Sequence, residues 1–286
     1  MRIDAHQHFW SFDPAQFPWI SAEMAVLRRD YHVAQAVALL DAHGFDSVVA
    51  VQARADWKEN EWLLAVAKQS SRIAGVVGWA DLCHDAAHAK LDEFLSQPES
   101  VGVRAMLQDM ADPALVLQSS IFNDYVKQIQ QHEQVYELLL RHDQLEGSVA
   151  FSQRNDRHVL VVDHLAKPDY QAGLASAPGL RWQQYFHQLG DLPHVYVKVS
   201  GLLTEVDAST LERTEHIDAL FHPFLDVALE CFGAQRLVFG SDWPVAHLCG
   251  GYDVGLGVIE RWAKARLSIT EAEQLFGGNA QRLYSR

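Results

Sequence analysis

Two histidines near the amino terminus, His6 and His8, are separated by one residue in the segment Asp-Ala-His-Gln-His-Phe-Trp. Residues i and i+2 of a β-strand point to the same face. The two imidazoles could therefore bind one metal ion or one substrate oxygen, and a neutral imidazole is a common metal ligand. The pair alone is equally compatible with a polar strand end, because short two-histidine patterns are frequent by chance.

An aspartate, Asp242, follows an apolar run in the segment Phe-Gly-Ser-Asp-Trp-Pro. A carboxylate at the end of a strand can act as a general base that takes a proton from water. The alternative is a turn aspartate, which is common before a proline-containing loop. His164 ends a similar run, Val-Val-Asp-His, where the alternative is a histidine that bonds the backbone. Strand alternation predicts that Asp163 points away from His164.

Two cations, Arg104 and Lys198, interrupt otherwise apolar runs. Burying a charge without a partner is costly, so each of them needs a counterion. That partner is either a neighbouring carboxylate, for which Glu137 and Asp81 are the candidates, or an oxygen of the substrate. The sequence leaves both options open.

Three further residues near strand ends are candidates for binding a substrate. Gln52 ends the second apolar run, and Trp10 and Trp243 follow the first and the last. An indole offers a flat apolar face that suits the C–H face of a sugar ring. Both tryptophans could equally pack at the end of the strands.

These residues are predicted to lie at the ends of eight strands that alternate with helical segments. Nearly continuous apolar runs indicate strands covered on both faces, as in a parallel sheet. Eight such strands predict a single (β/α)8 barrel over residues 1–286, a fold whose active site lies at the carboxyl ends of the strands. The runs are Arg2–Ala5, Ser47–Gln52, Ile73–Trp79, Val101–Ala105, Val135–Leu140, His158–His164, Val195–Ser200 and Arg236–Ser241.

The helical segments between the runs carry recognisable start signals. Residues 87–95 have one apolar helix face. Asp56 with Glu59, and Thr270 with Glu273, resemble capping boxes that open a helix over 57–69 and a last helix ending near Gly277. Residues 202–222 form a long connection that could fold over the site as a lid.

The composition excludes several classes of protein. The net charge of −14 without a basic stretch argues against nucleic acid or an anionic membrane as a partner. The three cysteines are far apart, which suggests neither a disulfide framework nor a thiolate metal site. Reduced cysteines and the lack of an apolar leader predict a cytoplasmic protein.

The motifs together resemble the amidohydrolase superfamily, and within it the sugar-lactonase branch that contains L-fuconolactonases and 2-pyrone-4,6-dicarboxylate lactonases. The resemblance extends from Arg2 to Tyr284. It rests on Asp-Ala-His-Gln-His-Phe-Trp, Val-Val-Asp-His-Leu-Ala-Lys-Pro, Val-Lys-Val-Ser-Gly-Leu, Phe-Gly-Ser-Asp-Trp-Pro-Val and Phe-Gly-Gly-Asn-Ala-Gln-Arg-Leu-Tyr. It implies that four residues are catalytic, namely His6, His8, His164 and Asp242.

The ligand set departs from that of the binuclear members of the superfamily. The fourth run offers Arg104 and the fifth offers Glu137, without the further histidines of a two-metal site. The resemblance therefore implies no obligatory cofactor, and at most one divalent ion such as zinc on His6, His8 and Asp242.

The expected reaction is the opening of a sugar-acid lactone, with L-fuconolactone or a stereochemically related aldonolactone as the substrate of a sugar catabolic route. Asp242 would activate the water, the histidines would stabilise the oxyanion, and Arg104, Lys198 and Gln52 would bind substrate oxygens. The alternatives are a metal-dependent decarboxylase of the same superfamily and a barrel that binds a sugar acid without catalysis.

Overall fold

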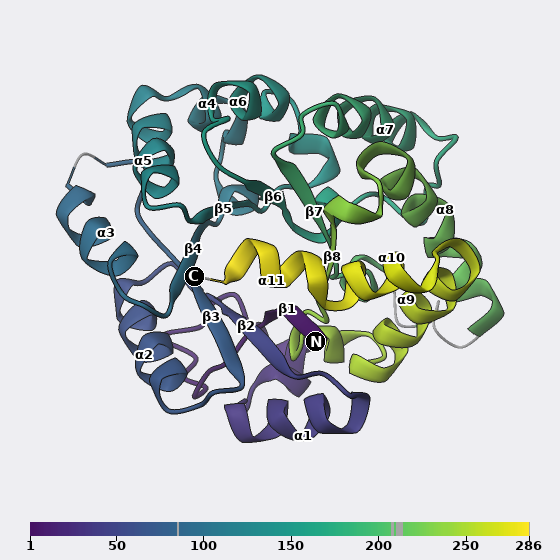
Figure 1. The fold of residues 1–286 in the computed structure, drawn as a ribbon, viewed down its shortest axis with the longest axis horizontal. Coiled ribbons are helices and arrows are strands. Elements are labelled where there is room, and N and C mark those ends of the chain that lie inside the picture. Colours follow the sequence, from purple (N-terminus) through teal and green to yellow (C-terminus); the bar gives the residue numbers. More distant parts are fainter. Residues whose placement is uncertain (85, 207–208, 210–213, 286) are drawn as a thin grey trace.

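Eight parallel strands form one sheet in the order β1 to β8 in a computed structural model, which describes residues 1–84, 86–206, 209 and 214–285 (Figure 1). The sheet closes into a barrel because the backbone N–H groups of Asp242 and His8 donate to the carbonyls of His6 and Trp243. The predicted (β/α)8 barrel is confirmed. The strands are β1 (Ile3–Gln7), β2 (Ser47–Val51), β3 (Ile73–Gly78), β4 (Ser100–Ala105), β5 (Val135–Leu138), β6 (Leu160–Val162), β7 (Val195–Val199) and β8 (Leu237–Phe239).

Helices follow the strands and surround the barrel (Figure 1). The last of them, α11, lies instead across the centre of the ring of strands, at the end of the barrel where the strands begin (Figure 1). The helices are α1 (Val33–His43), α2 (Trp57–Lys68), α3 (His88–Leu95), α4 (Pro113–Gln118), α5 (Ser120–Gln131), α6 (Ser148–Arg154), α7 (Ala177–Gly190), α8 (Thr214–Phe232), α9 (Tyr252–Arg266), α10 (Ile269–Glu273) and α11 (Asn279–Tyr284).

The two predicted capping boxes are wrong in detail. Asp56 caps α2 by accepting from the N–H of Lys58, but the buried Glu59 carboxylate turns back and accepts from the N–H groups of Ala53 and Arg54. The box of α10 is formed by Ser268 and Glu271, two residues earlier than predicted. In both cases the side chain bonds the nearest N–H groups that lack a backbone partner, and the sequence spacing of the two residues alone does not predict which these are.

Two further boundaries differ from the predictions. The terminal helical region does not end near Gly277, because a π-helical turn (Gln274–Gly278) leads directly into α11. The long connection predicted over residues 202–222 is shorter than expected, since α8 begins at Thr214. Residues 207–208 and 210–213 of that stretch lie outside the described part of the chain.

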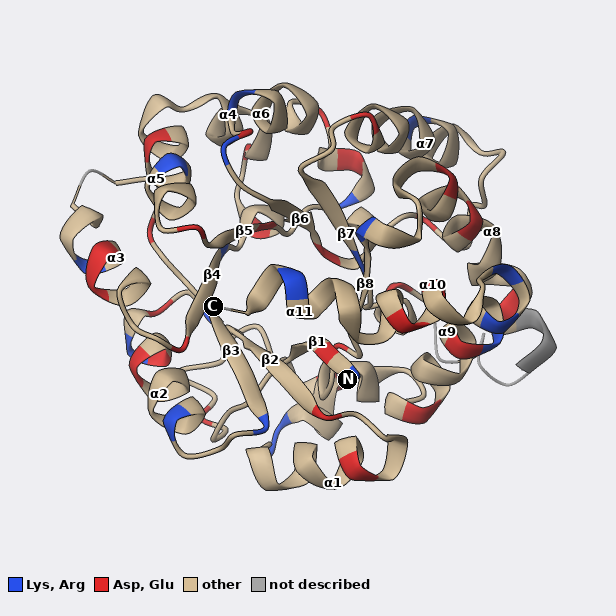
Figure 2. Ribbon diagram, in the orientation of Figure 1, with Lys and Arg blue, Asp and Glu red and all other residues tan. Residues whose placement is uncertain are grey.

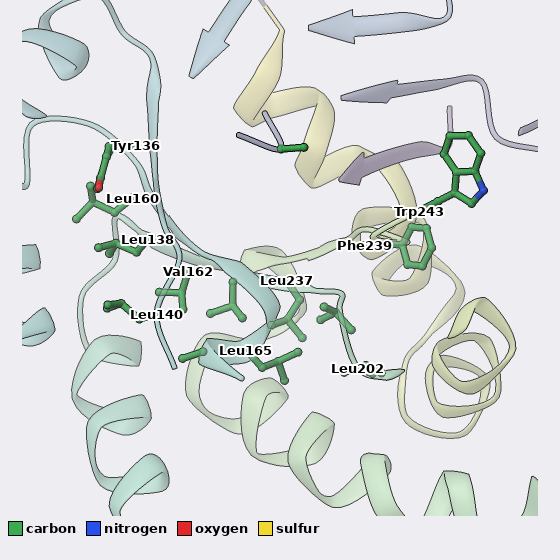
Figure 3. Packing of buried hydrophobic residues seen from close by; sticks show 14 of the residues in the cluster. Tyr136, Leu138, Leu140, Leu160, Val162, Leu165, Leu202, Leu237, Phe239 and Trp243 are labelled. Carbon is green, nitrogen blue, oxygen red and sulfur yellow. The ribbon is translucent and has the colours of Figure 1, made fainter. Parts of the chain in front are cut away.

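Side chains alternate between two hydrophobic clusters, one inside the barrel and one between the sheet and the helices. On β6, Leu160 and Val162 belong to the outer cluster, part of which is shown in Figure 3, and Val161 belongs to the inner one. From α11, Leu283 and Tyr284 join the inner cluster and close that end of the barrel. Burial on both faces explains the nearly continuous apolar runs.

Charged residues of both signs are interspersed over the outer helices (Figure 2). A few others lie on the strands themselves, inside the barrel. Among the described helices, none is long and apolar enough to cross a membrane.

Candidate active site

The four catalytic candidates meet at the carboxyl ends of the strands. His6 Nε2 lies 3.2 Å from His8 Nε2, and Asp242 Oδ1 lies 3.8 Å and 3.3 Å from these two atoms. The His164 ring centroid is 4.5 Å from that of His6. All four residues are at least 96% buried, so their interactions are only weakly screened by water.

Unusual backbone geometry positions two of these residues. Asp242 has φ of 58°, and His164 begins a run of four non-glycine residues with positive φ that ends at Lys167. Such conformations are costly and are concentrated at functional sites. The turn at His164 also breaks the strand alternation. The prediction that Asp163 points away from His164 is therefore wrong, because Asp163 Oδ1 lies 3.7 Å from His6 Nδ1 in the same site.

Two glycines make room for the imidazoles. A Cβ atom at Gly240 would lie 2.6 Å from the Cβ of His6, and one at Gly201 would lie 2.6 Å from Nδ1 of His164. Gly201 also has φ of 62°, a conformation that favours glycine. Any larger residue at either position would displace a histidine of the site.

The contacts of His8 and His6 constrain where their protons lie. His8 Nδ1 lies 2.8 Å from the carbonyl of Val51, which can only accept, so His8 Nδ1 carries a proton. Lys198 Nζ, which can only donate, lies 3.1 Å from His6 Nδ1. Arg104 Nη1, which can also only donate, lies 3.3 Å from His6 Nε2, so a neutral His6 can accept from only one of the two cations. Burial, followed by Lys198, lowers the pKa of His6 well below its ordinary value.

His164 and Asp242 combine a neutral imidazole with an ionised carboxylate. Burial lowers the pKa of His164 to about 4, and its Nδ1 lies 2.8 Å from Ser200 Oγ. Burial would raise the pKa of Asp242, but His164 and His8 favour the ionised form, and its pKa is lowered overall. At neutral pH the site therefore holds a base beside a neutral hydrogen-bonding group.

Four charged side chains lie beneath the histidines and form what we call the inner ion network: Arg104, Glu137, Asp163 and Lys198. Lys198 Nζ lies 2.6 Å from Glu137 and 3.4 Å from Asp163, whose other oxygen lies 2.9 Å from Arg104. Burial would raise the pKa of Asp163, but the two cations hold it at about 2. Of the partners that the sequence leaves open for Lys198, the structure shows the carboxylate of Glu137.

A cavity of about 310 Å³ opens above these residues. This volume suits a small-molecule ligand. The cavity is lined by His8, Trp19, Met24, Ala53, Arg104, Met106, Gln108, Asp109, Leu139, His164, Lys167, Thr204, Glu205, Asp242, Val245 and Leu248.

Three lining residues carry buried polar atoms that have no hydrogen-bond partner among the described residues. They are the indole Nε1 of Trp19, Nε of Arg104 and Oε1 of Gln108. Buried polar atoms of this kind are normally satisfied by a partner. These three atoms have almost no accessible surface, so they lie behind the cavity wall rather than on it.

The profile of the amidohydrolase family matches residues 3–286. The chain belongs to this family. An L-fucono-1,5-lactonase of Burkholderia multivorans is 41% identical over 100% of this chain and 96% of its own length. An L-fucono-1,5-lactonase of Burkholderia ambifaria is 32% identical over 99% of this chain and 95% of its own length. A Burkholderia multivorans amidohydrolase crystallised with bound zinc superposes with a TM-score of 0.93, at 40% identity and 99% coverage of both chains.

This amidohydrolase site has the spacing to hold one divalent ion. The edges of a tetrahedral zinc site with nitrogen and oxygen ligands are about 3.3 Å long. The ligand atoms of His6, His8 and Asp242 are 3.2 to 3.8 Å apart, and these residues form a possible metal-binding group. Lys198 Nζ and Arg104 Nη1 lie beside the two ring nitrogens of His6, and two cations at this distance oppose the binding of a further cation.

Of the five predicted substrate-binding residues, only Arg104 lines the amidohydrolase cavity. Lys198 and Gln52 are fully buried beneath it, and a carbonyl of Gln52 accepts from Arg104. The indoles of Trp10 and Trp243 both pack edge-on against Tyr31, with ring centroids 5.5 Å and 5.3 Å apart, and neither lines the cavity.

The prediction for Asp81 is corrected. Asp81 lies close to His84, at 2.9 Å, and does not reach Arg104 or Lys198. The carboxylate beside Arg104 is Asp163 instead. β3 ends at Gly78, so Asp81 lies in the following loop rather than inside the barrel.

Several cavity residues were missed by the sequence analysis. Trp19 lies in the loop after β1, and Gln108 follows β4. Lys167 and Glu205 follow β6 and β7, and Lys167 Nζ lies 3.0 Å from Glu205 Oε1. Of these residues, only Lys167 could have been identified from the sequence, because it comes three residues after His164 in the same motif.

Proposed function

We propose that this amidohydrolase opens the ring of a sugar-acid lactone, with L-fuconolactone or a stereochemically related aldonolactone as its substrate. The observation that carries the proposal is the buried, ionised Asp242 beside a neutral His164 at the floor of a cavity. The two L-fucono-1,5-lactonases to which the chain is 41% and 32% identical support this substrate class. Polar residues that line the cavity, among them Gln108 and Thr204, suit a ligand that carries hydroxyl groups.

In the proposed reaction Asp242 takes a proton from a water molecule, whose oxygen attacks the lactone carbonyl carbon. His8 Nε2 lies 3.3 Å from Asp242 Oδ1 and is placed to orient this water. The carbonyl oxygen becomes an oxyanion, which His164 and Arg104 stabilise from the cavity wall. The ring C–O bond then breaks, and the leaving alkoxide takes the proton back from Asp242.

A metal ion is not required in this mechanism. If one divalent ion binds His6, His8 and Asp242, it supplies Lewis-acid polarisation of the carbonyl. The Lys198 and Arg104 cations lie 3.1 Å and 3.3 Å from the two nitrogens of His6 and already provide positive charge beside the site. We therefore expect activity without an added metal.

The experiment is an acid-release assay with a pH indicator on a panel of aldonolactones, with and without a chelator. Asp242→Asn should keep the fold and lose turnover by roughly a few hundredfold or more, as for a lost general base. Asp81→Asn is the matched control, because it makes the same isosteric change outside the cavity and should keep normal turnover. Near-normal hydrolysis by Asp242→Asn would overturn the mechanism. Loss of activity with chelator and recovery with zinc or manganese would instead indicate a metal-dependent enzyme.

A further inference from the structure

Both cations on the cavity wall are already paired with carboxylates. Arg104 lies 2.9 Å from Asp163 Oδ2, and Lys167 Nζ lies 3.0 Å from Glu205 Oε1. A paired cation offers much less attraction to an incoming anion than a free one does. Neither Arg104 nor Lys167 is thus available as the sole counterion of a substrate carboxylate.

Two further carboxylates, Asp109 and Asp242, line the same cavity. Within the described residues, Asp109 forms no ion pair, and Asp242 contacts only histidines among possible cations. The cavity wall therefore carries more negative than positive charge. The net charge of −14 adds a long-range repulsion of anions.

We infer that Glu205 makes the cavity selective for uncharged lactones, because it neutralises Lys167 and leaves no free cation for a carboxylate on the substrate. This inference rests on the proposed function and adds a rule for its substrates. An aldonolactone with hydroxyl or methyl substituents is accepted, whereas a lactone that carries an additional carboxylate is rejected.

The location of the Lys167–Glu205 pair explains why it can act as a specificity element. Lys167 ends the strained turn that begins at His164, and Glu205 follows the neighbouring strand β7. Their side chains are 16% and 23% exposed, and both residues line the cavity, so a substrate can approach Lys167. Rejecting an unwanted ligand through an unfavourable charge is a common source of specificity.

The same charge distribution favours release of the product. Ring opening converts a neutral lactone into a hydroxy acid, which is ionised at neutral pH. This new carboxylate forms beside Asp242, and like charges at short distance repel each other. A cavity without a free cation therefore binds the substrate better than the product.

Binding of three matched ring ethers tests the inference without any hydrolysis. The probes are 1,5-anhydroalditols whose exocyclic carbon is an alcohol, a primary amide or a carboxylate. Calorimetry on the wild-type protein should show that the alcohol and the amide bind at least about tenfold more tightly than the carboxylate. This difference should shrink in high salt, because screening weakens the repulsion. Equal binding of the amide and the carboxylate overturns the inference.

Glu205→Gln tests the role of the pair directly. The variant should improve relative binding of the carboxylate by about tenfold, because Lys167 then carries an uncompensated charge. Glu146→Gln is the matched control, since it removes a carboxylate from a surface pair with Arg181 at 3.5 Å and should leave the preference unchanged. In the double variant Lys167→Met/Glu205→Gln the gain should disappear, since the freed cation is gone.

The possible results separate this inference from the proposed function. An unchanged preference in Glu205→Gln, or a gain that persists in the double variant, overturns the inference whatever the enzyme hydrolyses. If the wild type hydrolyses no lactone but still prefers the neutral ethers, the proposed function fails and the charge rule stands. If Glu205→Gln does not fold, the three-probe comparison on the wild type still decides.

Discussion

Two lysine–glutamate pairs in this barrel have similar geometry and very different surroundings. Lys198 lies 2.6 Å from Glu137 inside the barrel, where both side chains have no exposure to solvent. Lys167 lies 3.0 Å from Glu205 on the cavity wall, where both are partly exposed. The difference teaches that burial, not the types of residue, decides whether such a pair supports the fold or selects the substrate.

The inner pair cannot open without a large cost. Removing one partner leaves a charge that has neither water nor a counterion, and this is strongly destabilising. Tyr284 from α11 also donates to Glu137 at 2.7 Å, so the last helix of the chain is tied to the charge that holds Lys198 beside His6. The outer pair has water within reach, so the loss of one partner leaves a charge that water can partly solvate.

The largest expected effect is on stability in the Lys198→Met variant. It leaves the Glu137 and Asp163 carboxylates buried without their shared cation, and we expect the free energy of unfolding to fall by about 3–5 kcal/mol. Urea denaturation followed by circular dichroism measures this change.

Lys167→Met is the matched control for this variant, because it removes the lysine of the outer pair. Its free energy of unfolding should fall by only about 1 kcal/mol, because Lys167 and Glu205 keep some contact with water. Equal losses in the two variants would contradict the distinction between the inner and the outer pair.

A smaller effect is expected for Tyr284→Phe. The substitution removes only the hydroxyl that donates to Glu137, and a hydrogen bond to a charged group contributes about 1.5–3 kcal/mol. The unfolding midpoint in urea should fall accordingly. The control is Tyr196→Phe on β7. The Tyr196 side chain is only partly buried, so losing its hydroxyl should lower the unfolding midpoint less. A midpoint that is unchanged in Tyr284→Phe would show that Lys198 alone satisfies Glu137.

The fold could be predicted because its signal is repeated along the chain. Runs such as those around Val49 and Val161 are apolar on both faces, and only a sheet covered on both sides explains eight of them. The polar residues that end the strands were found for the same reason. A barrel brings strand ends together whatever the loops do.

The parts that could not be predicted depend on contacts between distant segments. The positive φ values from His164 to Lys167 bring both Asp163 and His164 to the site, against simple alternation. Trp10 and Trp243 have the right residue type near strand ends, but packing against Tyr31 turns them away from the cavity. Local sequence does not encode such loop conformations, so the pairing of Lys167 with Glu205 could not have been foreseen.

The smallest expected effect is on the stability of Glu205→Gln, and it gives the sharpest test of the comparison. The free energy of unfolding should change by less than about 1 kcal/mol, because solvent screens the freed Lys167. Glu137→Gln makes the same chemical change in the inner pair and should cost several times more, since Lys198 cannot be hydrated there. Urea denaturation of the two variants, in parallel, measures both values. A large loss in Glu205→Gln would mean that the outer pair holds the loops after β6 and β7 in place, and its effect on ligand preference would then have to be attributed to a displaced cavity wall.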